Sequence, residues 1–196
     1  MTSINENIIS EAEERNRNLL ADELLKLIEI YHPHEEPGVS RETVAAYSEA
    51  LTGGAQGSFD RGTFDETVNA RLTDAETWAD ADSFYALGTD RISIYPGSWH
   101  DDIGRSTDVR EYIRYLRDEA DEFESFSSQG TGYGIPESDL IDIVAVVGRT
   151  DPDAVKARIE DLRDGGAIVE GPDQHPDARV RLAEDADEVQ DPTLDK

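Results

Sequence analysis

The chain has no cysteine among its 196 residues. Disulfide bonds, thiolate catalysis and cysteine-ligated zinc sites are therefore excluded. It also has no run of 18 apolar residues, and its first residues, MTSINENIISEAEERN, lack the basic segment and apolar core of a secretory signal. We therefore expect a soluble, cytoplasmic protein that makes no contact with a membrane.

Lysine is nearly absent, because only Lys26, Lys156 and Lys196 occur. Asp and Glu number 45 against 18 Lys and Arg, which gives a formal net charge of −27. At molar salt the Debye length falls to about 3 Å, so the repulsion within such a surface is screened. The composition therefore favours the salt-rich cytoplasm of a halophilic archaeon. The alternative, a charged and disordered chain, conflicts with the amphipathic segments that follow.

The first half contains three predicted helices and then a hairpin. Apolar residues at three- and four-residue spacing predict a helix over 18–31, and further helices are predicted over 40–51 and 64–78. Thr63 or Asp65 is the expected cap of the third helix. The runs SFYAL and RISIY flank GTD, a pattern that predicts a β-hairpin.

The second half repeats this order of elements without detectable sequence identity to the first. Helices are predicted over 106–123, 137–148 and 151–164, and GIP supplies a short strand before the second of them. Asp151 is the expected N-cap of the third helix, and the glycine pair after it stops the helix. AIVE and ARVRLA form a closing two-stranded ribbon.

These elements predict a mainly α fold with small β-hairpins, an α+β class, and specifically winged helices arranged two in tandem. The expected domains are an N-terminal helical domain with a hairpin over 1–104, itself a candidate winged helix, and a C-terminal winged-helix domain over 105–185. An acidic, disordered tail is expected over 186–196.

Residues 133–182 resemble the C-terminal winged-helix domain of archaeal minichromosome maintenance helicases. The resemblance is carried by Ile135, Pro136, Leu140, the helix that runs to Leu162 and the segment GGAIVE. It covers about a quarter of the chain and implies the fold more than the role, because winged helices serve many functions. The helicase ATPase is absent, since no G-x-x-x-x-G-K-[ST] motif occurs.

Six basic residues gather in the segment that resembles a winged helix. They are Arg149, Lys156, Arg158, Arg163, Arg179 and Arg181. In winged helices that bind DNA, the third helix enters the major groove and the ribbon contacts the backbone. The resemblance therefore implies groove contacts for Lys156, Arg158 and Arg163. It implies backbone contacts for the other three, and the strand alternation predicts that Arg179 and Arg181 face away from the core.

Carboxylates on the same segment support a different interpretation. Asp153, Glu160, Asp161, Asp164 and Asp177 nearly cancel the six basic residues. The arginines would then form ordinary surface ion pairs, and the winged helix would bind a protein or form a dimer.

A second basic stripe, Arg110, Arg114 and Arg117, follows helical spacing in DVREYIRYLRDE. It could meet DNA or a partner helix, but pairing with Glu111, Asp118 and Asp121 is the favoured explanation.

Two histidine-containing segments could carry other chemistry. HPHEE, residues 32–36, brings two imidazoles and two carboxylates together, but a polar loop that ends a helix is the favoured interpretation. In GSWHDD, His100 could act with Asp101 or Asp102 in acid–base chemistry, but no nucleophile motif accompanies it, and Trp99 is expected to be a packing anchor between the halves.

No nucleotide-binding loop, dinucleotide fingerprint or catalytic triad is present in the sequence. We therefore expect a non-enzymatic protein without cofactor or metal. The first expectation is a transcriptional regulator that binds double-stranded DNA, with a homodimer as its expected form. The alternative is an interaction module that docks a partner of the replication or transcription machinery. At molar salt, counterion release contributes little to the affinity of any protein for DNA. In a salt-rich cytoplasm the negative net charge therefore argues only weakly against DNA binding.

Overall fold

A computed structural model of the chain describes residues 4–15, 19–52, 59–118, 134–170 and 178–186. The chain forms two compact units, Met1–Gly104 and Arg105–Lys196. Both are mainly helical with one small sheet each, so the predicted α+β class is confirmed. None of the helices in the described ranges is long and apolar enough to span a membrane.

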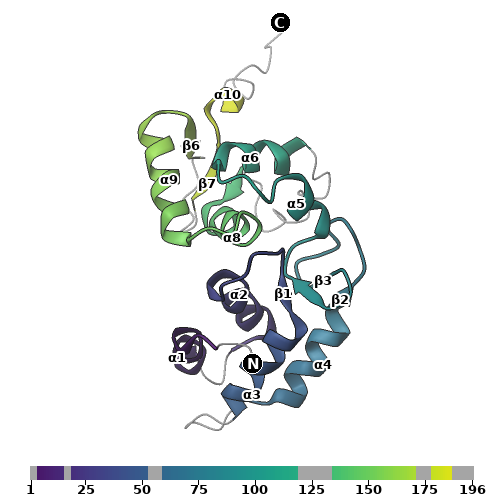
Figure 1. Ribbon diagram of the computed structural model, residues 1–196. Coiled ribbons are helices and arrows are strands. Elements are labelled where there is room, and N and C mark those ends of the chain that lie inside the picture. Colours follow the sequence, from purple (N-terminus) through teal and green to yellow (C-terminus); the bar gives the residue numbers. More distant parts are fainter. Residues whose placement is uncertain (1–3, 16–18, 53–58, 119–133, 171–177, 187–196) are drawn as a thin grey trace, which may run out of the picture. The chain divides into compact units, whose positions relative to one another are not determined.

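The first unit packs helices around a four-stranded sheet (Figure 1). Its elements are α1 (Glu6–Arg15), α2 (Ala21–Tyr31), β1 (Val39–Ser40), α3 (Arg41–Thr52), α4 (Arg61–Arg71), β2 (Leu72–Thr73), β3 (Phe84–Leu87), β4 (Arg91–Ser93) and α5 (Gly97–Asp102). The strand order is β1-β4-β3-β2, with β2 parallel to β3 and the other pairs antiparallel. The core joins α1–α4 to the sheet, and its buried residues include Ile8, Leu24, Tyr47, Phe64, Phe84 and Ile92.

The helix expected over 64–78 is displaced toward the N-terminus. Its cap is Asp60, not Thr63 or Asp65, because the Asp60 carboxylate accepts from both the backbone N and the hydroxyl of Thr63 at 3.0 Å. The helix ends at Arg71 because the next two residues extend and pair with β3. Backbone pairing in the sheet therefore overrides the helical spacing that the sequence shows there.

The described residues of the second unit form helices and a three-stranded sheet (Figure 1). Its elements are α6 (Val109–Asp118), β5 (Ile135–Pro136), α8 (Glu137–Val147), α9 (Pro152–Asp164), β6 (Ile168–Glu170), β7 (Arg179–Leu182) and α10 (Ala183–Ala186). The antiparallel order is β5-β7-β6. Tyr112, Leu116, Leu140, Ile143 and Ile159 are among its fully buried side chains.

Parts of three predictions lie outside the described residues. The first is the helix expected over 106–123, of which the part beyond Asp118 is not described. The second is the tip of the ribbon, which includes Asp177. The third is the tail expected over 186–196, of which only Ala186, at the end of α10, is described.

The same kind of contact, which we call the arginine clasp, occurs within each of the two units. A glycine with positive φ precedes the first strand of each sheet, Gly38 at 66° and Gly134 at 118°. The strand that pairs with this first strand begins with an arginine, which is Arg91 in β4 and Arg179 in β7. The guanidinium of Arg91 donates to the carbonyl oxygen of Gly38, and that of Arg179 donates to the carbonyl oxygen of Gly134. The same residue types therefore close the same corner in both units.

Candidate nucleic-acid interface

The helix α9 is fixed at both ends by the signals that its sequence predicts. The Asp151 side chain accepts from the backbone N atoms of Asp153 at 2.9 Å and Ala154 at 3.3 Å, Pro152 opens the first turn, and Gly165 is the C-cap. The apolar face of the helix is buried through Val155, Ile159 and Leu162. The opposite face is therefore available to a partner.

The outward stripe of α9 is acidic. It consists of Asp153, Ala157, Glu160 and Asp164, which follow four- and three-residue spacing and are all exposed. Asp161 is exposed beside them. Lys156 and Arg158 are two residues apart, so they point about 160° away from each other on opposite flanks of the stripe. The two cations do not form a common basic ridge.

Arg163 is held by carboxylates of two other elements. Its Nη2 contacts Glu137 at the start of α8 and lies 2.8 Å from Oε1 of Glu170 in β6. The guanidinium thus joins α9 to its neighbours, and the expected groove contact would have to break this network.

Arg179, which the strand alternation predicts on the face away from the core, is buried. Only 7% of the residue is exposed, and its Nη1 donates to the Gly134 carbonyl oxygen at 3.0 Å. It is buried because β7 is the central strand, and the corner before β5 covers its first residue. Arg181 is half-buried on the same strand, and Arg149 occupies the turn between α8 and α9 with φ 51°.

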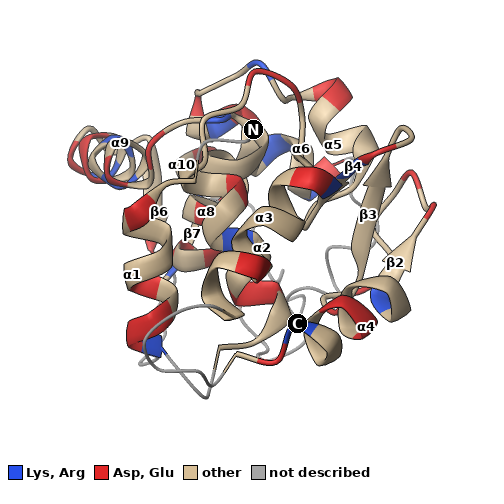
Figure 2. Cartoon of the chain, turned by 60° about the horizontal axis from the view of Figure 1, so that its bottom comes forward, with Lys and Arg blue, Asp and Glu red and all other residues tan. Residues whose placement is uncertain are grey.

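The second basic stripe, on α6, is engaged in ion pairs. Arg110 contacts Asp108 at 2.6 Å, Arg114 contacts Glu184 at 3.3 Å, and Arg117 pairs with Asp118 and Asp185. The hydrogen bonds from Arg110 lower the pKa of Asp108. Pairing with the expected Asp118 is therefore confirmed, and two further partners, Glu184 and Asp185, come from α10. The expected partner Asp121 lies outside the described residues. In both units, acidic and basic segments are interspersed along the helices (Figure 2).

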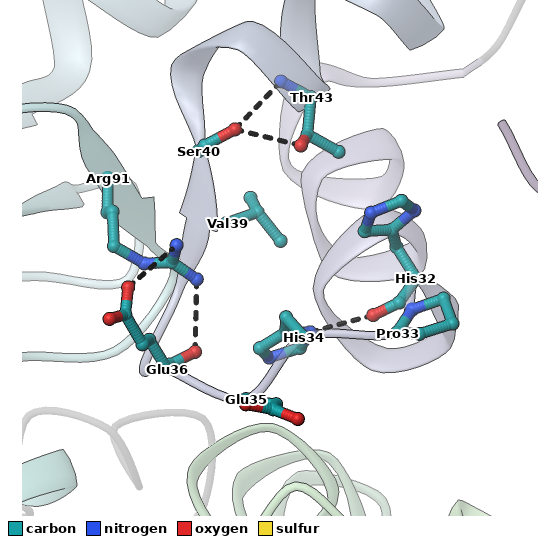
Figure 3. A pocket seen from close by; sticks show the side chains of 9 residues that line it. All are labelled: His32, Pro33, His34, Glu35, Glu36, Val39, Ser40, Thr43 and Arg91. Carbon is teal, nitrogen blue, oxygen red and sulfur yellow. Dashed lines mark hydrogen bonds and ion pairs between the residues drawn. The ribbon is translucent and has the colours of Figure 1, made fainter. Parts of the chain in front are cut away.

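The HPHEE segment lines a pocket of about 300 Å³ between α2 and β1 (Figure 3). His34 Nδ1 donates to the His32 carbonyl oxygen at 2.7 Å, and burial lowers the pKa of His32. Arg91 points into the loop but already donates to its carbonyl groups and contacts Glu36 at 3.3 Å. Among the residues that the structure describes, no three His, Asp or Glu side chains gather as a metal site.

His100 and Trp99 are both buried in the first unit. Trp99 stacks on Trp78 and Tyr95 with ring centroids 5.5 and 5.4 Å apart, so its packing partners lie within that unit. His100 Nε2 lies 2.9 Å from the Ser93 hydroxyl oxygen. Ser93 is inaccessible to solvent, which makes it unsuitable as a nucleophile for an external substrate.

Glu29 belongs to the same buried cluster, and sequence reasoning overlooked it. It lies on α2 with 1% of the residue exposed, and its Oε2 accepts from the Ile94 backbone N at 3.0 Å. A signal was present, because Glu29 follows Leu25 by four residues and so shares the edge of the apolar face.

Comparison with known protein families, curated proteins and solved structures finds no match to this chain.

Proposed function

We propose that both units are winged helices and that the chain is a tandem pair. The support is the element order helix, strand, helix, helix, strand, strand, which the described elements from α6 to β7 follow and which α2 to β4 follow with one additional strand, β2, after α4. In each sheet the last of these strands is central and pairs with the first, as in β1-β4-β3 and β5-β7-β6. The arginine clasp at the same position in both units supports the repeat.

We further propose that the protein is a non-catalytic interaction module and that α9 of the second unit binds a basic segment of a partner protein. The observation that carries this proposal is the acidic outward stripe of α9. In a duplex groove, Asp153, Glu160 and Asp164 would face the negative potential of the phosphates, whereas a Lys- or Arg-rich protein surface complements them. Contacts of this kind act at hydrogen-bond distance, where salt screens them least.

Binding of double-stranded DNA by a transcriptional regulator, with a homodimer as its form, is the second candidate. The observation that favours it is that Lys156 and Arg158 are exposed. The charge of Arg158 also acts on Asp108, whose pKa is lowered first by its hydrogen bond with Arg110. On opposite flanks of α9, Lys156 and Arg158 could reach phosphates on the two walls of a major groove. Arg163 and Arg179 are left out of this candidate interface because both are engaged within the fold.

One crosslinking experiment separates the two candidates. A photoreactive amino acid replaces Ala157, which is exposed at the middle of the stripe, in cells that produce the protein. We expect a protein adduct that Asp153→Asn/Glu160→Gln/Asp164→Asn reduces about tenfold, a loss of ~1.4 kcal/mol in binding. The matched control, Lys156→Ala/Arg158→Ala, should leave the adduct in place.

The opposite pattern would overturn the protein-partner proposal. An adduct with nucleic acid that the Lys156→Ala/Arg158→Ala variant abolishes would establish the DNA candidate in its place. Absence of any adduct would remove α9 as the binding surface.

A further inference from the structure

The helix α1 precedes the elements that we assign to the first winged helix, α2 to β4, and packs against α2 and α3. Its apolar side is buried through Ile8 and Ala12, which are 2% and 1% exposed and belong to the core of the first unit. The contacts that hold the start of α1 therefore decide whether the apolar surface beneath it stays covered.

The first turn of α1 is held by Asn5, the residue before the helix. The Asn5 side chain accepts from the Asn7 backbone N at 3.0 Å and so caps the helix, and its Nδ2 donates to the Tyr31 carbonyl oxygen at 3.3 Å. The Asn5 backbone N donates to the Tyr47 hydroxyl oxygen at 2.8 Å. One residue thus joins α1 to the end of α2 and to α3.

The Tyr47 hydroxyl also meets an imidazole. Its oxygen lies 3.0 Å from Nδ1 of His32, the residue after α2, and the two rings are nearly perpendicular with centroids 5.6 Å apart. Tyr47 is fully buried, whereas His32 is half-buried and lines the pocket of the HPHEE segment (Figure 3). Protons from solvent therefore reach His32, although the hydroxyl group that it contacts is enclosed.

The valence of the hydroxyl favours one protonation state of His32. Tyr47 has one hydrogen to donate, and its oxygen already accepts from the Asn5 N–H, which can only donate. These hydrogen bonds are all satisfied if neutral His32 carries its hydrogen on Nε2 and accepts from Tyr47 at Nδ1. If His32 is protonated, Nδ1 becomes a donor, and the Tyr47 hydrogen has no remaining acceptor among the described residues. Such a buried, unsatisfied group is costly.

We propose that His32, Tyr47 and Asn5 form a proton-sensitive latch, in which protonation of His32 takes the Tyr47 oxygen from Asn5 and releases the first turn of α1. One proton enters at His32 Nδ1. The imidazolium then donates a charge-assisted hydrogen bond, which is stronger than that of a backbone amide, so the Asn5 N–H is the donor that is displaced. The apolar surface beneath Ile8 opens from that end. This inference is independent of what α9 binds.

The charged groups around His32 come from its own loop and from β4. The pocket that His32 lines also contains His34, Glu35, Glu36 and Arg91. Glu36 is paired with Arg91 at 3.3 Å, and His34 Nδ1 donates to the His32 carbonyl oxygen, not to its ring. Burial lowers the pKa of His32, in agreement with a site that favours the neutral ring. Because docked α1 disfavours the proton, docking is complete above about pH 7 and weakens as the pH falls.

Solvent exchange of the Asn5 backbone amide, measured by NMR in the full chain, tests the latch. We expect its protection factor, from which the intrinsic pH dependence of exchange is removed, to fall about tenfold between about pH 7.5 and about pH 5, the effect of losing one hydrogen bond. His32→Gln should keep this protection nearly constant, because its side chain does not titrate. His34→Gln alters the other histidine of the same loop, and as the matched control it should respond as wild type.

The titration of Glu29 on α2 does not imitate this response. Burial raises its pKa to about 7, so its protonation strengthens the first unit as the pH falls, whereas release of the latch weakens the protection of Asn5. Glu29 is also present in both histidine variants, so the difference between wild type and His32→Gln isolates the imidazole.

Four results would overturn the latch. One is a protection factor of Asn5 that does not change with pH in the wild-type protein, a measurement that depends on no variant. The second is the wild-type fall in His32→Gln, and the third is loss of the fall in His34→Gln, which would assign the response to His34. The fourth comes from nitrogen-15 NMR of the ring, if neutral His32 carries its hydrogen on Nδ1 and so cannot accept from Tyr47.

Discussion

At the scale of single residues, burial decides what a charged side chain does. Arg158 and Arg179 have the same side chain and are close in sequence, but one is exposed on α9 and the other is enclosed by the corner before β5. The alternation of β7 indicates a shared face for Arg179 and Arg181, yet it contains no information about which end of the strand another segment covers. That information comes from tertiary structure.

Glu29 makes the stability of the first unit dependent on pH. Its pKa is raised to about 7 in the folded state from 4.5, so the folded state binds more protons and the stabilisation is complete only below about pH 4.5. It is lost as the pH rises through about 7. Between about pH 5 and pH 8, wild type should lose about 2 to 3 kcal/mol relative to Glu29→Gln.

Urea unfolding of both proteins across this pH range measures the difference. Because the other carboxylates titrate identically in the two proteins, the comparison isolates Glu29. Parallel curves for wild type and Glu29→Gln would show that the carboxyl group is not perturbed by folding.

At the scale of elements, local signals locate some boundaries and miss others. The N-cap Asp151, the C-cap Gly165 and the GTD hairpin follow from short sequence patterns, because capping and tight turns use residues close in sequence. The strand β2 has no such signal, since it exists only through pairing with β3. Short α5 is likewise missed, because its position depends on packing of its buried Trp99 and His100.

The candidate site follows the same division. The sequence predicts α9, its buried face and its mixture of cations and carboxylates. It does not predict that Arg163 pairs with Glu137 on another helix, or that the α6 arginines find Glu184 and Asp185 about 70 residues away. Long-range partners of this kind depend on the folded topology.

The arginine clasp leads to a prediction for both units. At Gly38 an added Cβ would lie 2.6 Å from the Ile92 carbonyl oxygen, and at Gly134 it would lie 2.9 Å from that of Val180. Positive φ adds strain of about 1 to 2 kcal/mol for any residue with a side chain. Gly38→Ala and Gly134→Ala should therefore each destabilise their unit by about 2 kcal/mol or more.

Gly165→Ala is the control for these two variants. Gly165 is the C-cap of α9. Its φ of −76° suits alanine, and an added Cβ would lie 3.2 Å from the nearest atom, the carbonyl oxygen of Asp161. Denaturant midpoints measure all three. Equal midpoints for Gly38→Ala, Gly134→Ala and Gly165→Ala would contradict the steric role of the clasp.

At the scale of the whole molecule, the charge of −27 predicts a strong response to salt. The described ion pairs engage many of the arginines, but 45 acidic residues leave a large excess of carboxylates whose repulsion salt screens. Raising potassium chloride from about 0.1 M to about 2 M should raise the melting temperature by at least ~5 °C, the shift that about 1 kcal/mol produces in units of this size.

Thermal unfolding followed by circular dichroism at several potassium chloride concentrations measures this response. A melting temperature that is constant or falls with salt would contradict the expected adaptation to a salt-rich cytoplasm.

The stack of Trp78 and Trp99 gives the molecule a built-in optical label. These are the chain's two tryptophans, and both belong to the first unit. Emission excited at the red edge of indole absorption therefore monitors that unit alone, whereas the far-ultraviolet signal sums over both. If the halves melt at different temperatures, comparing the two spectra assigns each transition to its half without cutting the polypeptide.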